Sequence, residues 1–186
     1  MTVARKEAAQ AQRGKAEVNP RDALVLLTAD HNQIDKLVRE FERHRKKADV
    51  AEKGKAALRV CHAFERYETV KQEVFYPAAD AVLTGEDKEL LGKARVAHET
   101  LDHLIEKIES MPADDAAFDA TVAVFAEQAH RLMKAEEEKL FPRLRHSRLD
   151  LVGTGERMAS RQTELATAPI DRETIRRARK VLGGRS

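Results

Sequence analysis

Cysteine, glycine and proline are all scarce in this chain of 186 residues. Cys61 is the single cysteine, so the chain can form neither an internal disulfide nor a zinc or iron–sulfur site built from cysteines, and a reducing compartment fits best. The 8 glycines and 5 prolines, beside 35% charged and 42% hydrophobic residues, are typical of helical proteins with charged outer faces. This composition excludes a β-sandwich and a collagen-like chain.

Long apolar runs are missing as well. The first residues, MTVARKEAAQAQRGK, have no apolar centre of the kind that a signal peptide needs, and no run is long enough to span a bilayer. The formal net charge of +2 creates no overall field that would favour nucleic acid or an anionic membrane as a partner. We therefore expect a cytoplasmic, soluble protein with neither of these partners.

Four stretches of the chain place apolar residues three and four positions apart, which is the spacing of one packed helix face. The first helix is predicted to begin with Asn19 as its cap and Pro20 in its first turn. The other three helices are expected over 51–82, between Gly85 and Met111, and over 114–145. Pro77 and Pro142 fall late in the second and the fourth.

The two halves of the chain repeat each other. A shift of 67 residues places the first apolar stripe on the third and aligns His31 with His98. A shift of 65 residues carries VFYP at 74–77 onto KLFP at 139–142, and Lys71 onto Glu136. This repeat predicts an all-α protein, an up-down-up-down four-helix bundle made of two helical hairpins in tandem.

The domain is expected to cover 19–166, and it includes a short amphipathic C-terminal helix over 149–165 that packs on the bundle. Residues 1–18 are polar and basic without an apolar stripe, which predicts a disordered arm. Residues 167–186 are expected to form a basic tail. Without interleaved aromatic residues, neither segment indicates a nucleic-acid site.

Polar residues interrupt the apolar stripes at one level of the expected bundle. His31 lies about ten residues into the first helix and Lys71 lies six before Pro77 on the antiparallel second helix, so they should face each other. Buried ionisable groups are costly unless they are paired, hydrogen-bonded or bound to a metal, so this layer is the candidate functional site. Six stripe residues are expected to converge there: His31, Tyr67, Lys71, His98, Leu132 and Glu136.

The repeated segments ADHNQIDKL at 29–37 and VAHETLDHL at 96–104, each followed by a helix that ends in QEVFYP or EEEKLFP, resemble the hemerythrin-like HHE cation-binding family. The resemblance covers roughly 22–158. It implies a non-haem iron pair in the bundle core, with a role in oxygen binding or in the sensing or storage of oxygen, nitric oxide or iron.

The resemblance also implies a ligand set. The family pattern has one His on the first helix, His-x-x-x-Glu on the second, His on the third and His-x-x-x-Glu/Asp on the fourth. His31, His98 and Glu136 match that pattern, whereas three family ligand positions are substituted: Tyr67, Lys71 and Leu132.

Two interpretations of this layer follow. In the first, His31, His98 and Glu136 hold a mononuclear or weakly bound iron, with Tyr67 as an additional phenolate ligand and a diatomic gas as the ligand sensed. In the second, the core is metal-free and a Lys71 to Glu136 ion pair replaces the cation. The bundle would then be a regulatory or protein-interaction module with a protein partner.

The remaining residues give weaker signals. His44 and His62 approach each other near the first helix connection, where a surface metal contact is weakly indicated. Glu73, Glu137 and Glu138 are expected on a solvated face. The chain has no Gly-rich phosphate loop, serine elbow or His/Cys dyad, so the sequence gives no basis for an enzyme.

Overall fold

The computed structural model describes residues 19–47 and 49–167, and helices are the regular structure of this part of the chain. The expected N-terminal arm and all but Thr167 of the expected tail lie outside the described residues. The helices are α2 (Ala23–Lys46), α3 (Val50–Val70), α4 (Tyr76–Asp80), α5 (Gly85–Ser110), α6 (Phe118–Ala135), α7 (Phe141–Arg145) and α8 (Leu151–Thr167). Among them, no helix is both long and apolar enough to cross a membrane.

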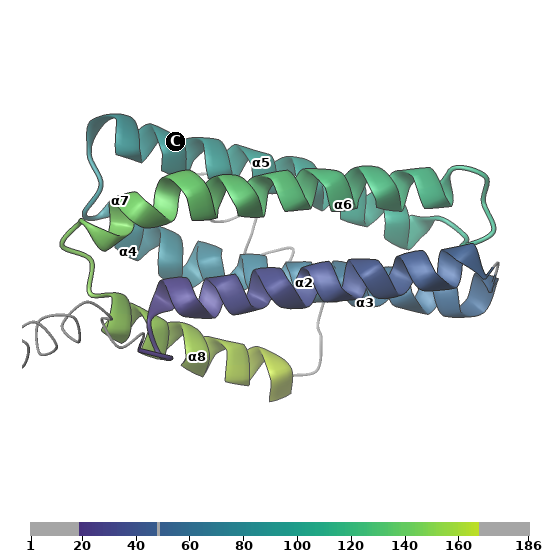
Figure 1. Cartoon of the computed structure of the whole chain (residues 1–186), viewed down its shortest axis with the longest axis horizontal. Helices are drawn as coiled ribbons and strands as arrows, with labels where there is room; N and C mark the ends of the chain where they lie inside the picture. Colours follow the sequence, from purple (N-terminus) through teal and green to yellow (C-terminus); the bar gives the residue numbers. More distant parts are fainter. Residues whose placement is uncertain (1–18, 48, 168–186) are drawn as a thin grey trace, which may run out of the picture.

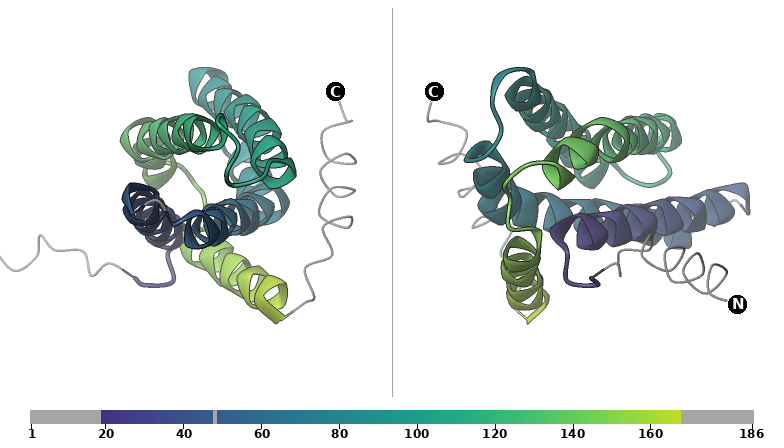
Figure 2. Two further views of the ribbon diagram at one scale, coloured as in Figure 1. Left: turned by 90° about the vertical axis from the view of Figure 1, so that its right-hand side faces the viewer. Right: turned by 60° about the vertical axis from the view of Figure 1, so that its left-hand side comes forward.

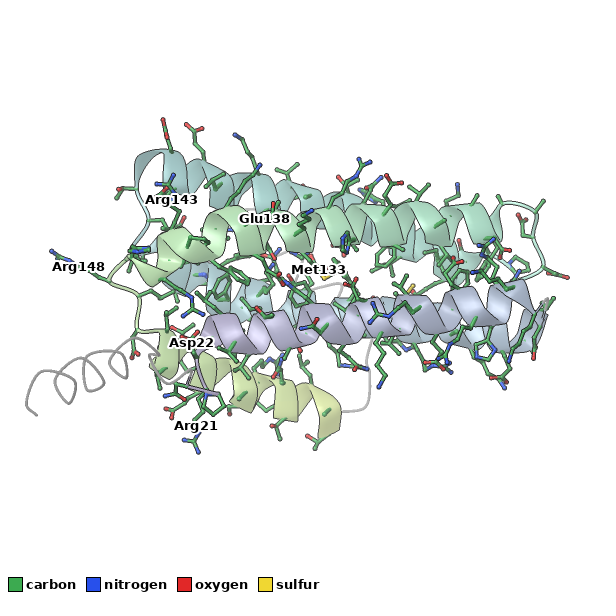
Figure 3. The ribbon with its side chains drawn as sticks, in the orientation of Figure 1. Arg21, Asp22, Met133, Glu138, Arg143 and Arg148 are labelled. Carbon is green, nitrogen blue, oxygen red and sulfur yellow. The ribbon has the colours of Figure 1, made fainter. Side chains whose placement is uncertain are left out.

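Four long rods surround a common core, as the sequence predicted. The first pair of rods consists of α2 and of the rod that contains α3 and α4. The second pair consists of α5 and of the rod that contains α6 and α7 (Figure 1). Viewed end-on in Figure 2, these rods enclose the centre of the molecule, and α8 lies outside them. Buried aromatic rings such as Phe41, Phe64 and Phe125 fill the interior. Charged side chains cover the outer faces, and Arg148 points away from the bundle ahead of α8 (Figure 3).

Two predicted helix starts are wrong, and local hydrogen bonds explain both. The cap of α2 is Asp22, whose Oδ1 accepts from the Leu24 N–H at 2.8 Å, because Asn19 is used in the turn before the helix, where its Oδ1 accepts from Arg21 N–H. The fourth rod begins at Phe118 instead of 114. Asp115 Oδ1 accepts from the Ala117 N–H at 2.7 Å, and this bond favours a turn over a helix.

Each hairpin contains a π-helical turn where a plain α-helix was expected. These turns are η2 (Lys71–Phe75) and η3 (Glu136–Leu140), so they are offset by the same 65 residues as the sequence repeat. Pro77 and Pro142 follow them closely. A proline ring clashes with the carbonyl four residues before it, and the wider turn relieves that clash. The π turns thus mark the level of the polar layer.

Helix α8 packs against α2, α3 and η2. Met158 is its fully buried residue, and Arg161 forms a two-pronged ion pair with Glu73 of η2, with Nε 2.5 Å from Oε2. At Gly155 the helix meets the start of α2 so closely that a Cβ there would lie 1.8 Å from the Arg21 carbonyl oxygen. This contact requires glycine.

Candidate functional site in the bundle core

The expected polar residues do meet in the core, and they come from every rod of the bundle. His31 is on α2, Tyr67 on α3, Lys71 at the start of η2, His98 on α5 and Glu136 at the start of η3. All of these side chains are buried. The sixth expected residue, Leu132, is buried on α6 but adds no polar atom.

The Lys71 ammonium lies at the centre of this layer. Its Nζ donates to the Tyr67 hydroxyl at 2.7 Å and to His98 Nε2 at 3.0 Å, and it forms a short ion pair with Glu136 Oε1. The Tyr67 and Tyr76 rings lie beside it, with centroids 4.5 and 5.0 Å away. Since an ammonium can only donate, His98 Nε2 accepts and its proton sits on Nδ1, which faces Glu68 Oε1 at 3.9 Å.

A second arm of the network runs from Tyr67 to the surface. The Tyr67 hydroxyl donates to Glu136 Oε2 at 2.7 Å and contacts His31 Nε2 at 2.8 Å, while His31 Nδ1 lies 2.6 Å from Glu137 Oε1. The Tyr67 hydroxyl has one proton, and that proton serves Glu136. All three bonds are therefore satisfied together when His31 carries a proton on each ring nitrogen. Lys71 then faces the Glu136 carboxylate, and His31 faces that of Glu137.

Burial and charge set the protonation of these groups. Burial lowers the pKa of Lys71, and the Glu136 carboxylate partly offsets that shift. Burial works to raise the pKa of Glu136, but the Lys71 ammonium and the neighbouring His31 hold it well below its usual range. Burial and the charge of Glu136 raise the pKa of Tyr67 well above its usual value, so its phenol keeps its proton.

Comparison with known families agrees with this architecture. The family model described as the hemerythrin HHE cation binding domain matches residues 22–144. The chain belongs to this hemerythrin family. The resemblance noted in the sequence is therefore confirmed, and so is the helical bundle fold. No curated protein and no solved structure matches the chain.

The core of this hemerythrin-family bundle does not fit the cation that the family name implies. Of the four expected ligands, Glu136, Tyr67 and His98 each contact the Lys71 ammonium, which lies where their lone pairs converge. The fourth, His31, contacts the Tyr67 hydroxyl. A second cation there would be strongly repelled at short range.

Three further residues of the polar core layer were not identified by the sequence analysis. Glu137 was expected in solvent but reaches His31. Tyr76 donates to Glu136 Oε1 at 3.3 Å, and Glu68 is a buried partner of His98. Tyr76 is five residues after Lys71, a spacing that shares no face of an α-helix, so the π turn was needed to place it. In the sequence, the one signal of this π turn was a proline soon after a polar residue of the apolar stripe.

A cavity of about 380 Å³ opens between the second pair of rods beside this layer. Its walls are largely apolar and are formed by α5, α6 and η3, with Leu132 and Glu136 among them. The lining also contains three exposed cationic residues, Lys93, Arg131 and Lys139. The cavity thus has apolar walls and exposed cationic side chains in its lining, of which Arg131 is paired with Glu127.

Proposed function

We propose that this hemerythrin-family bundle functions without iron in its core, as a regulatory module that binds a ligand. In this proposal the ion pair between Lys71 and Glu136 replaces the family's cation. One observation carries it: Lys71 Nζ contacts Glu136, Tyr67 and His98, which are three of the four groups that a core metal would take as ligands. The opposite charges of Lys71 and Glu136 then compensate each other with no metal cofactor.

Iron content tests the proposal. The chain is expressed untagged in medium replete in iron, and its iron content and absorption spectrum are measured. We expect no stoichiometric iron and no tyrosinate-to-iron absorption band. The matched variant restores the family ligands through Tyr67→His, Lys71→Glu and Leu132→His. This variant should gain iron, which shows that the core can be loaded when its donors allow it.

A reduced mononuclear iron site is the second candidate. It is favoured by the convergence of His31, His98 and Glu136, two imidazoles and one carboxylate, with Tyr67 in contact with two of them. This site would bind a diatomic gas, in line with the family role. It requires the Lys71 side chain to leave the layer. About one iron per unchanged chain with a tyrosinate band would favour this candidate and overturn the metal-free core.

The cavity beside the core indicates the class of ligand. Apolar walls with the exposed Lys93 and Lys139 in the lining are complementary to an amphipathic anion, that is, a carboxylate with a hydrocarbon tail. Decanoate is a suitable probe, measured by calorimetry. We expect Ala97→Trp, which fills the cavity, to weaken binding at least tenfold. Val96→Trp is the matched control, since Val96 is 61% exposed and outside the cavity lining. Equal affinities in the two variants would contradict this assignment.

A further inference from the structure

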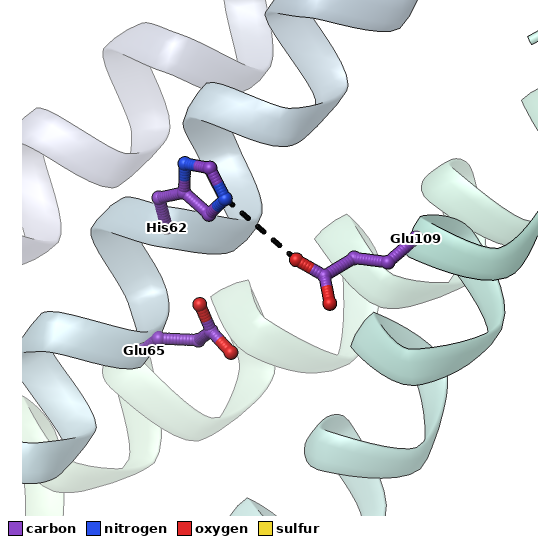
Figure 4. Close-up of side chains that lie close together, drawn as sticks. All are labelled: His62, Glu65 and Glu109. Carbon is purple, nitrogen blue, oxygen red and sulfur yellow. Dashed lines mark ion pairs between the residues drawn. The ribbon is translucent and has the colours of Figure 1, made fainter. Parts of the chain in front are cut away.

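A second group of metal-ligating side chains lies between α3 and α5, away from the core layer. His62 and Glu65 stand one turn apart on α3, and Glu109 faces them from the last turn of α5 (Figure 4). His62 Nε2 is 3.7 Å from Glu109 Oε1. One ligand atom from each of the three side chains falls within 4.8 Å of the others. Two rods therefore bring one nitrogen and two carboxylate oxygens close to one another.

The charges at this point favour a cation. Glu65 and Glu109 bring two carboxylates together, and like charges in proximity are unfavourable. Glu109 also lies near the C-terminal end of α5, where the negative end of the helix dipole disfavours a carboxylate. The His62 and Glu109 side chains are only 25% and 19% exposed, so water screens these repulsions less than at an open surface. His62 Nε2 lies within ion-pair distance of Glu109, and a divalent cation would attract both carboxylates.

We propose that His62, Glu65 and Glu109 form a peripheral site for a divalent transition-metal ion of the Zn²⁺ type. One imidazole nitrogen and two carboxylate oxygens are a donor set that such ions accept, with water completing the coordination. The helix spacing of His62 and Glu65 presents both ligands on one face of α3. The third ligand comes from the other hairpin, so the bound ion links the two halves of the bundle.

This site is separate from the core. His62 precedes Lys71 by nine residues on the same rod, which corresponds to about 13 Å along the helix. Sequence analysis associated His62 with His44, but the ligand group found in the structure contains Glu65 and Glu109 and does not include His44. Sequence spacing could not indicate Glu109, because it belongs to a different hairpin. The proposal thus holds whether or not the core binds iron.

Metal titration of the chelator-treated full chain tests the site. Zn²⁺ is added in a calorimeter, and Co²⁺ is added with its visible absorption recorded as a report on coordination. We expect one ion per chain and Co²⁺ bands typical of low coordination number. His62→Gln and Glu109→Gln should each weaken Zn²⁺ binding at least tenfold. Binding should also raise the melting temperature of the parent protein, because the ion joins α3 to α5.

The chain offers a matched control. His103 and Glu106 are a His and a Glu three residues apart on α5, with Nδ1 3.9 Å from Oε2, and they are exposed. His103→Gln and Glu106→Gln should leave Zn²⁺ affinity unchanged. The proposal is overturned if the parent binds no Zn²⁺, if the control variants lose binding, or if Glu136→Gln abolishes it while Glu109→Gln does not. Circular dichroism of each metal-free variant verifies that the helices remain folded.

Discussion

Lys71 donates to Glu136 across the centre of the bundle, and both side chains are almost completely buried. A buried ion pair is not in itself a source of stability, because desolvation of the two charges offsets their attraction. The pair persists here because Tyr67 and His98 supply further hydrogen bonds to Lys71. Its importance lies in mutual dependence, since neither charge is tolerable in that position without the other.

Removal of one partner should therefore lower the free energy of unfolding more than removal of both. We expect Lys71→Met to lower the free energy of unfolding by about 3–5 kcal/mol, because Glu136 remains buried without its main cationic partner. The double variant Lys71→Met with Glu136→Leu should recover most of that loss. Denaturant titrations of the parent, both single variants and the double variant complete the cycle. Simple additivity would show that the two residues do not act as a pair.

The Tyr67 hydroxyl connects the two arms of the hydrogen-bond network. It should therefore contribute more to stability than the Tyr76 hydroxyl does. Tyr67→Phe removes a group that contacts His31, Lys71 and Glu136, so we expect a loss of about 2–3 kcal/mol in stability. Tyr76→Phe removes one longer bond of 3.3 Å to Glu136, and its cost should stay below about 1 kcal/mol. Urea unfolding compares the two. A larger loss for Tyr76→Phe would refute the described hydrogen-bond pattern.

Asp30 should make stability depend on pH in the acidic range. Burial raises its pKa from 3.8 to about 6, although His31 and a hydrogen bond from Gln162 of α8 act in the opposite direction. The folded protein therefore holds this proton at a higher pH than the unfolded chain does. Ionisation of Asp30 costs stability as the pH rises through about 6, and this cost disappears below about pH 4.

Replacement of Asp30 by Asn isolates that effect. Because the Asn amide oxygen can still accept from Gln162, the variant should be more stable than the parent by about 1–3 kcal/mol at pH 7.5. The two proteins should have nearly equal stability at pH 4. Melting temperatures at both pH values measure the difference. A difference that does not change with pH would show that the Asp30 proton is not responsible.

The contact of α8 with the start of α2 should tolerate no side chain at position 155. A Cβ on Gly155 would collide with backbone atoms of Arg21 and Ala23, so we expect Gly155→Ala to cost about 2 kcal/mol and to loosen α8. Gly92→Ala is the control, because a Cβ there meets nothing within 4 Å on α5. It should instead stabilise by about 0.5–1 kcal/mol. Hydrogen exchange of α8 amides, together with melting temperatures, distinguishes local loosening from global loss.

The sequence predicted the architecture well because apolar spacing and the internal repeat are local signals. His31, Lys71, His98 and Glu136 stood out as polar breaks in apolar stripes, and these breaks do meet in the core. Their roles as metal ligands or as an ion pair stay predictions. Glu137, Tyr76 and Glu109 could not be found in this way. Their contacts depend on the reach of a long side chain, on a π turn and on the approach of a distant helix.

The two π turns have a consequence for chain length. An α-helix separates residues five positions apart by about 140° around its axis, yet Lys71 and Tyr76 are both turned inward. Each turn holds one residue more than a regular helix needs at that point. Deletion of Gln72 would therefore let the backbone adopt ordinary α-helical hydrogen bonding, and the tyrosine, then four positions after the lysine, would stay on the same helix face. An α-helix that kept the extra residue would turn the tyrosine away from the lysine, so the added residue and the π turn depend on each other.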